Sequence, residues 1–132
     1  MARRLTPGTF SKGWVTELAA LAPGRHVSVE VHADLPVPSS RISALGMVVA
    51  ELVTNSLKYG AGAVKVELAR AADDLAVTVS DEGKGFPAEF PASQGSGLGA
   101  RLIRTYSGHG REAIRIDRDV AFGRITVRFR PA

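Results

Sequence analysis

Residues 39–60 read SSRISALGMVVAELVTNSLKYG and contain the strongest structural signal of the chain. The apolar residues among them recur every three or four positions, which predicts an amphipathic helix. Ser39 or Ser40 would cap the start of this helix, and Gly60 would end it. At about 100° per residue, one face of the helix is apolar and is expected to pack on a core. The residues of that face are Ile42, Leu45, Val49 and Leu52.

The opposite face of the same helix carries a carboxylate, an amide and an ammonium group, from Glu51, Asn55 and Lys58. The simplest interpretation is the solvated face of an amphipathic helix. The choice of Asn55 favours a functional interpretation, because asparagine is a poor residue for the middle of a helix. An amide oxygen beside a carboxylate and a lysine suits a site for Mg²⁺ and phosphate.

Alternating apolar residues predict strands on both sides of this helix. One strand precedes it and a hairpin that turns at Asp73 and Asp74 follows it; the strands are 27–32, 64–68 and 75–79, with two closing strands near 113–116 and 125–129. Further helices are expected over 11–21 and 98–106, and loops over 35–38 and 81–97. This order predicts an α/β fold. We expect a two-layer sandwich in which three helices cover one face of a mixed, mostly antiparallel sheet.

Length and composition predict a single globular domain over residues 1–132. Hydrophobic residues at 45% and charged residues at 23% exclude a disordered or fibrous chain. No apolar run is long enough to span a bilayer, and no secretory signal pattern opens the chain. The absence of cysteine excludes a disulfide framework and thiolate chemistry. We therefore expect a cytoplasmic domain that makes no membrane contact.

The basic charge is concentrated in the last quarter of the chain. Residues 101–132 hold 8 arginines against 3 acidic residues, whereas residues 1–100 hold 9 basic and 10 acidic residues. Such a patch could meet nucleic acid, an acidic protein or a phosphate-bearing ligand. An RNA-binding sheet carries aromatic residues among its basic ones, and only Phe122 and Phe129 are available there. Arginine on the outward face of strands is the simpler interpretation, and we expect no nucleic-acid partner.

Asp81 follows the strand 75–79 in phase with its apolar residues, so its side chain is expected on the helix-covered side of the sheet. A carboxylate there needs a hydrogen-bond donor. An exocyclic amine of a base would supply one, and so would a backbone N–H in a local turn. Gly83 and Gly85 would allow the backbone to approach a ligand closely.

A second glycine-rich segment, Gly95-Ser96-Gly97-Leu98-Gly99, lies at the predicted start of the last helix. Exposed backbone N–H groups and the field of a helix N-terminus favour phosphate at such a place. A flexible glycine hinge is the alternative interpretation.

Three segments in this order resemble the N, G1 and G2 boxes of the GHKL ATP-binding superfamily, which joins DNA gyrase, heat-shock chaperones, mismatch-repair ATPases and sensor histidine kinases. They are Glu51-Leu52-Val53-Thr54-Asn55-Ser56-Leu57-Lys58-Tyr59, Asp81-Glu82-Gly83-Lys84-Gly85-Phe86-Pro87 and Gly95-Ser96-Gly97-Leu98-Gly99. The resemblance covers about residues 39–129. The run Asn-x-x-Lys-Tyr and the short stretch between the boxes are most similar to the catalytic domain of a sensor histidine kinase with a short ATP lid. The resemblance implies the Bergerat-type version of the α/β sandwich.

The resemblance also implies a role for each box residue, with ATP and Mg²⁺ as cofactors. Asn55 would coordinate Mg²⁺, Glu51 would lie beside the metal, and Lys58 would reach the phosphates. Tyr59 would line the nucleotide pocket, and Asp81 would accept a hydrogen bond from the adenine amine. Residues 86–94 would form the lid. At the remaining nucleotide-binding positions the backbone would run past the base or meet the phosphates. These positions are Gly83, Gly85, Gly95, Gly97, Leu98 and Gly99.

Two features depart from patterns common in the family. One sub-class of histidine kinases has a histidine in the N box and a Trp-x-Glu signature. In this chain Ala50 occupies the position of that histidine, and Val79-Ser80-Asp81 replaces Trp-x-Glu. A threonine often follows the glycine of the last hairpin, and here Arg124 follows Gly123. We therefore assign no such role to the nearby Thr126.

No histidine of the chain has the setting expected of a phosphoacceptor: His26 and His32 lie on or beside a predicted strand, and His109 lies in a predicted loop. The resemblance implies that the acceptor lies on a separate dimerisation domain, that a response regulator acts downstream, and that this chain suits an excised catalytic domain. The alternatives are an anti-sigma-type serine kinase and a nucleotide-binding pseudo-kinase interaction module. A gyrase-like ATPase, with Glu51 as general base, would need a further transducer domain.

Overall fold

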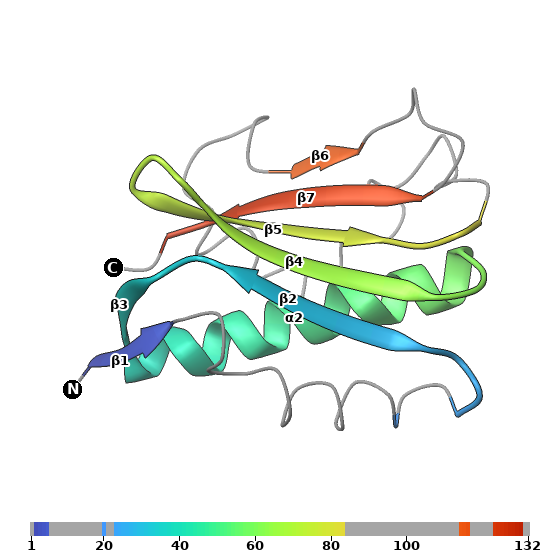
Figure 1. Ribbon diagram of the computed structural model, residues 1–132, viewed down its shortest axis with the longest axis horizontal. Coiled ribbons are helices and arrows are strands. Elements are labelled where there is room, and N and C mark those ends of the chain that lie inside the picture. The colour runs from blue at the N-terminus through green and yellow to red at the C-terminus, as the bar shows by residue number, and fades with distance from the viewer. Residues whose placement is uncertain (1, 6–19, 21–22, 84–113, 117–122, 131–132) are drawn as a thin grey trace.

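The structure, a computed structural model, describes residues 2–5, 20, 23–83, 114–116 and 123–130 (Figure 1). One long helix, α2 (Ser39–Tyr59), lies among the described elements. The strands are β1 (Ala2–Leu5), β2 (Val27–His32), β3 (Leu35–Pro38), β4 (Val64–Ala71), β5 (Asp74–Ser80), β6 (Ile114–Ile116) and β7 (Arg124–Phe129). The predicted helices 11–21 and 98–106 and most of the predicted loop 81–97 lie outside the described residues.

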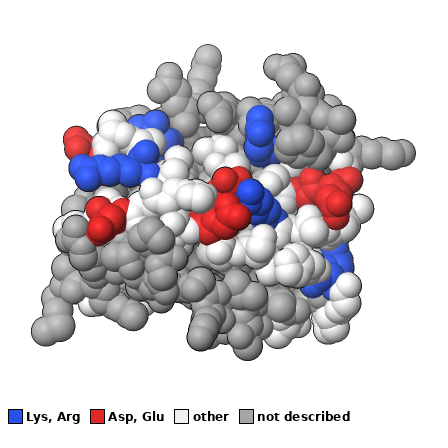
Figure 2. Space-filling view, in the orientation of Figure 1, with Lys and Arg blue, Asp and Glu red and all other residues white. Residues whose placement is uncertain are grey.

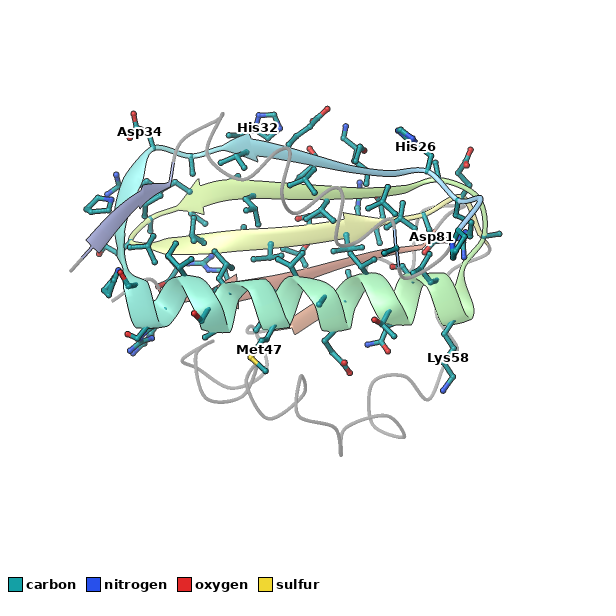
Figure 3. The ribbon with its side chains drawn as sticks, turned by 90° about the horizontal axis from the view of Figure 1, so that it is seen from below. His26, His32, Asp34, Met47, Lys58 and Asp81 are labelled. Atoms are coloured by element: carbon teal, nitrogen blue, oxygen red, sulfur yellow. The ribbon has the colours of Figure 1, made fainter. Side chains whose placement is uncertain are left out.

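Five of the strands form one sheet in the order β2-β4-β5-β7-β6. The β2–β4 pair is parallel and the other three pairs are antiparallel, so the sheet is mixed and mostly antiparallel as predicted. Helix α2 runs along one face of this sheet (Figures 1 and 3). The two-layer α/β arrangement predicted from the sequence is confirmed.

The core lies between α2 and the sheet. In the register of β5 with β7, Leu75, Val77 and Val79 stand opposite Phe129, Val127 and Ile125, and all six are buried. The helix contributes the stripe predicted from its periodicity, Ile42, Leu45, Val49 and Leu52, with relative exposures between 0% and 8%. Period two in the strands and period 3.6 in the helix thus place both apolar faces against one another.

The hairpin of β4 and β5 is confirmed, but its turn lies one residue earlier than expected. Ala71 pairs with Asp74, so the turn consists of Ala72 and Asp73. Ala72 takes the left-handed conformation at φ 55°, which a residue with a Cβ adopts at some cost.

The prediction of a loop over residues 35–38 was wrong. This segment is β3, which pairs antiparallel with β1. Leu35 and Val37 are buried while Pro36 is exposed, so the short strand has an inner and an outer face. The two prolines concealed this alternation, because proline is normally read as a turn signal although it is tolerated in edge strands.

The predicted serine caps of the helix were also wrong. The N-cap residue is Pro38, at φ −55° and ψ 143°, and no side-chain hydrogen bond caps the helix. Since Val37 must stay extended to reach the core, the chain turns into the helix directly after Pro38, whose ring already holds a helix-compatible φ. Gly60 ends the helix as predicted, and its N–H donates to the carbonyl of Ser56 at 2.8 Å.

The face of the sheet away from α2 is polar, with acidic and basic side chains side by side (Figure 2). On β2 and β4, at one side of this face, Lys65 Nζ lies 3.4 Å from Glu30 Oε2, and His32 Nε2 lies 3.2 Å from the same oxygen. The hydrogen bond from Lys65 lowers the pKa of Glu30 below its ordinary value of 4.5.

Among the described helices, none is long and apolar enough to cross a membrane.

Removing side-chain volume from the core stripe of α2 should destabilise the fold. We expect Leu52→Ala, at a position only 1% exposed, to lower the free energy of unfolding by about 2–5 kcal/mol. Met47→Ala on the same helix, at a position 44% exposed, should change it by less than about 0.5 kcal/mol. Urea unfolding of both variants tests the layer assignment, and equal effects would contradict it.

The ion pair on the outer face can be tested by titration. We expect Lys65→Met to raise the pKa of Glu30 toward its ordinary value, as followed by NMR of the glutamate carboxyl carbon. Because the pKa is lowered in the folded state, the stabilisation by this pair is present above the unfolded pKa and is lost as pH falls through the folded value. An unchanged Glu30 titration in Lys65→Met would show that the pair does not form.

Candidate functional site

The candidate site lies where the C-terminal end of α2 meets the end of β5 (Figure 3). Asp81 directly follows β5 and is 5% exposed. It continues the inward alternation of Val77 and Val79, so its carboxylate lies on the helix side of the sheet as predicted. It is the one acidic side chain that is buried within the described part of the chain.

Backbone groups from two segments solvate this carboxylate. The N–H of Gly83 donates to Asp81 Oδ1 at 2.7 Å, and the N–H of Ala61 donates to the same oxygen at 3.4 Å. The local-turn alternative raised by the sequence is therefore present in the structure. No hydrogen bond from the described residues reaches Oδ2, which leaves this oxygen available to a ligand donor.

Three glycines leave the space that the carboxylate occupies. A Cβ added at Gly60 would lie 2.2 Å from Asp81 Cγ, one at Gly123 would lie 2.4 Å from Oδ2, and one at Gly83 would lie 2.8 Å from Oδ1. We call Gly60, Gly83 and Gly123 the glycine cradle. The sequence analysis predicted that Gly83 lets the backbone approach a ligand closely. In the structure, the lack of a side chain at Gly83 leaves room for the Asp81 carboxylate.

Further hydrogen bonds join the loop after α2 to the loop after β5. The N–H of Glu82 donates to the carbonyl of Ala61 at 2.9 Å, and the N–H of Ala63 donates to Glu82 Oε1. The N–H of Asp81 donates to the carbonyl of Gly123 at 2.9 Å, which ties in the residue before β7. Three chain segments therefore hold Asp81 in one place.

The polar face of α2 is arranged as the helical periodicity predicted. Glu51 and Asn55 are half-buried and lie one turn apart, and Lys58 is exposed in the last turn. Figure 3 shows Lys58 pointing away from the sheet at the end of α2 where Asp81 lies on the sheet side. Tyr59 is the last residue of the helix.

Ser56 is a polar residue of this region that the sequence reasoning missed. It is fully buried, and its Oγ has no hydrogen-bond partner within the described part of the chain. The available signal was its position, because it extends the apolar stripe of Val49 and Leu52 by one more turn. A serine where the pattern expects an apolar residue indicates either a small side chain required by packing or a polar group kept for a ligand.

Several predicted site residues lie outside the described residues. They are Gly85, Gly95, Gly97, Leu98 and Gly99, together with the expected lid over 86–94 and His109. Thr126 is described: its hydroxyl lies 3.0 Å from that of Thr78, across β5 and β7 on the face away from α2.

The acceptor and metal-ligating oxygens at this site fit ATP and Mg²⁺. The buried carboxylate with an available oxygen suits an amine of a base, and the amide and carboxylate of Asn55 and Glu51 offer the oxygen ligands that Mg²⁺ prefers. A second group of potential metal ligands, Glu30, His32 and Glu67, lies on the outer face. The ammonium of Lys65 already pairs with Glu30 there, so we interpret that group as an ion-pair network.

Comparison with known proteins identifies the family. Residues 40–131 match the family described as histidine kinase-, DNA gyrase B-, and HSP90-like ATPase. The sensor histidine kinase PdtaS of Mycobacterium tuberculosis is 34% identical over an alignment of 88 residues, and the match covers 61% of this chain and 18% of that protein. The blue-light-activated histidine kinase 2 of Erythrobacter litoralis is 31% identical over an alignment of 85 residues, and the match covers 59% of this chain and 25% of that protein. The matched stretch is thus a quarter or less of these relatives' length.

Solved structures confirm the fold. The ATP binding domain of PrrB from Mycobacterium tuberculosis aligns with a TM-score of 0.71 at 17% identity, over 99% of this chain and 98% of that one. The blue-light activated histidine kinase EL346 of Erythrobacter litoralis aligns with a TM-score of 0.69 at 19% identity, over 90% of this chain and 40% of that one. The family match and these relatives agree with the three boxes: the chain belongs to the histidine kinase-, DNA gyrase B-, and HSP90-like ATPase family and is similar to the ATP-binding domains of sensor histidine kinases.

Proposed function

We propose that this chain is the catalytic domain of a sensor histidine kinase, which binds ATP with Mg²⁺ and donates the γ-phosphoryl group to a histidine on a separate phosphoacceptor domain. The proposal takes residues 1–132 as one such domain. The observation that carries it is the buried Asp81 carboxylate in the glycine cradle, at the end of the helix that bears Asn55 and Lys58.

Asp81 would recognise the base. Its Oδ1 is engaged by backbone N–H groups, so Oδ2 would accept the hydrogen bond from the exocyclic amine of adenine. A charged acceptor in a buried setting makes a strong hydrogen bond, and a base without a donor at that position would leave the carboxylate unsatisfied. The buried, unpaired hydroxyl of Ser56 supports the same assignment, because such a group is normally satisfied by protein, water or ligand.

The polar face of α2 would hold the metal and phosphates. Asn55 would supply an amide oxygen to Mg²⁺, Glu51 would lie beside it, and Lys58 would neutralise phosphate charge. Bound ATP supplies the phosphoryl group, and transfer of that group depends mainly on positioning and charge neutralisation by such side chains. We also propose that Tyr59 and Gly83 line the pocket, and that the residues of the two glycine-rich segments, Gly85, Gly95, Gly97, Leu98 and Gly99, contact the nucleotide.

The phosphoacceptor histidine and the response regulator are proposed to lie outside this chain. His26 and His32 are exposed but lie beside or on β2 rather than on a helix (Figure 3). The two relatives described above are named histidine kinases, which favours a histidine acceptor over the serine acceptor of an anti-sigma-type kinase.

The nucleotide site can be tested by calorimetric titration with a non-hydrolysable ATP analogue. We expect Asp81→Asn to weaken binding about tenfold or more, with or without Mg²⁺, because the amine loses its charged acceptor. Asn55→Ala should instead remove the dependence of affinity on Mg²⁺. Thr78→Ala, on the opposite face of the sheet, is the matched control and should bind as the parent does. Unchanged affinity in Asp81→Asn would contradict the site.

Phosphoryl transfer tests the reaction itself. With γ-labelled ATP and a supplied phosphoacceptor domain of a sensor histidine kinase, the parent chain should label a histidine and Asn55→Ala should not, while keeping the parent's circular dichroism. Nucleotide binding without any labelled acceptor would favour the interaction-module alternative, and undiminished transfer by Asn55→Ala would refute the metal assignment.

The glycine cradle can be tested without touching the carboxylate. In Gly123→Ala the new methyl group would lie 2.4 Å from Asp81 Oδ2, so the carboxylate must move and affinity for the ATP analogue should fall about as far as in Asp81→Asn. Gly24→Ala is the control, since its Cβ meets nothing within 4 Å and adds only the backbone strain of φ +88°. Equal affinities of these two variants would show that the cradle has no part in binding.

A further inference from the structure

We infer that Arg25 is a positioning residue for base recognition, acting on Asp81 through the backbone of Ala61; this inference rests on the proposed function. Arg25 lies two residues before β2, far in the sequence from all three boxes. Its Nε donates to the carbonyl of Gly62 at 2.9 Å and its Nη1 donates to the carbonyl of Leu57 at 3.0 Å.

These two carbonyls lie on either side of the exit from α2. The last carbonyls of a helix have no partner within it, and a cation there is favoured by the helix dipole. Arg25 supplies both the donor and the charge at Leu57, while the same guanidinium holds Gly62 in the loop that follows. One rigid fork thus sets the distance between the end of the helix and the loop.

Ala61 lies within the segment that this fork holds. Its N–H donates to Asp81 Oδ1, and its carbonyl accepts from the N–H of Glu82. The N–H of Val64 donates to the carbonyl of His26 at 2.8 Å, so the residue after Arg25 anchors the far end of the same loop. A shift of this loop would therefore move one of the two N–H groups that donate to the Asp81 carboxylate, together with the carbonyl that accepts from Glu82 next to it.

The environment of Arg25 is unusual for a side chain that serves stability alone. Its Nη2 is buried and has no hydrogen-bond partner within the described part of the chain, where no carboxylate pairs with the guanidinium either. An unsatisfied buried nitrogen opposes folding. The fork geometry is what arginine provides here and what lysine, with a single flexible ammonium, does not.

The test compares two triphosphate analogues, one with adenine and one whose purine lacks the 6-amino group. The ratio of their affinities measures recognition of the amine by Asp81. We expect Arg25→Met to lower this ratio about three- to tenfold through weaker binding of the adenine analogue alone. Arg25→Lys should recover only part of the ratio. Arg70→Met is the matched control, because Arg70 Nε likewise donates to a loop carbonyl, that of Ala72 at 3.1 Å, at the hairpin turn of β4 and β5.

A merely structural role would reduce the melting temperature, or weaken both analogues equally, and leave the ratio unchanged; that result would overturn the inference. If Arg25→Met does not fold, the ratio in Arg25→Lys decides the matter: a parental ratio refutes the inference and a lowered one supports it. In the double variant Arg25→Met with Asp81→Asn, we expect no loss of the ratio beyond that of Asp81→Asn, since both changes act on one contact.

The same measurements separate this inference from the proposed function. An unchanged ratio in Asp81→Asn would refute base recognition by Asp81 and, with it, both proposals. A ratio that falls in Asp81→Asn but not in Arg25→Met would refute the role of Arg25 and leave the proposed function standing.

Discussion

The site is organised around one buried carboxylate. Asp81 is 5% exposed and follows a strand whose inward residues are all apolar. An ionised carboxylate in such a place requires donors, since burying it without them is costly. Backbone N–H groups of Gly83 and Ala61 supply them, and the glycine cradle provides the space. The course of three chain segments is thus tied to one side chain.

The two faces of the sheet differ in what they contain. The face covered by α2 holds the core and ends at Asp81, whereas the outer face carries the ion pairs around Lys65 and the hydroxyl pair of Thr78 and Thr126. On the outer face water screens the charges, so the ion pairs around Lys65 contribute little to stability. At the end of the covered face the polar groups are few, buried and directional, as in a site that recognises one ligand orientation.

Much of this was predictable from local pattern. The alternation in 64–68 and 75–79 predicted the hairpin, and the periodicity of 39–60 predicted both the core stripe and the polar face of α2. Where prolines interrupted the pattern it failed, because Leu35–Pro38 is held as a strand by pairing with β1, a partner at the other end of a long intervening segment. Ser56 escaped notice because its burial, rather than its residue type, makes it informative.

Which apolar residues of α2, β4 and β5 face the core, and that Asp81 points toward the helix side, could be read from the sequence alone. Each of these follows from periods of 2 and 3.6, which are properties of a single element. The groups that surround Asp81 become visible only in the folded chain. Ala61 and Asp81 are 20 residues apart, and Arg25 is 32 residues from Leu57 and 37 from Gly62. Contacts between residues so far apart in the sequence depend on how the helices and strands pack. Most of them also involve a backbone N–H or carbonyl, which nearly every residue type has, so the residue type gives no sign of them.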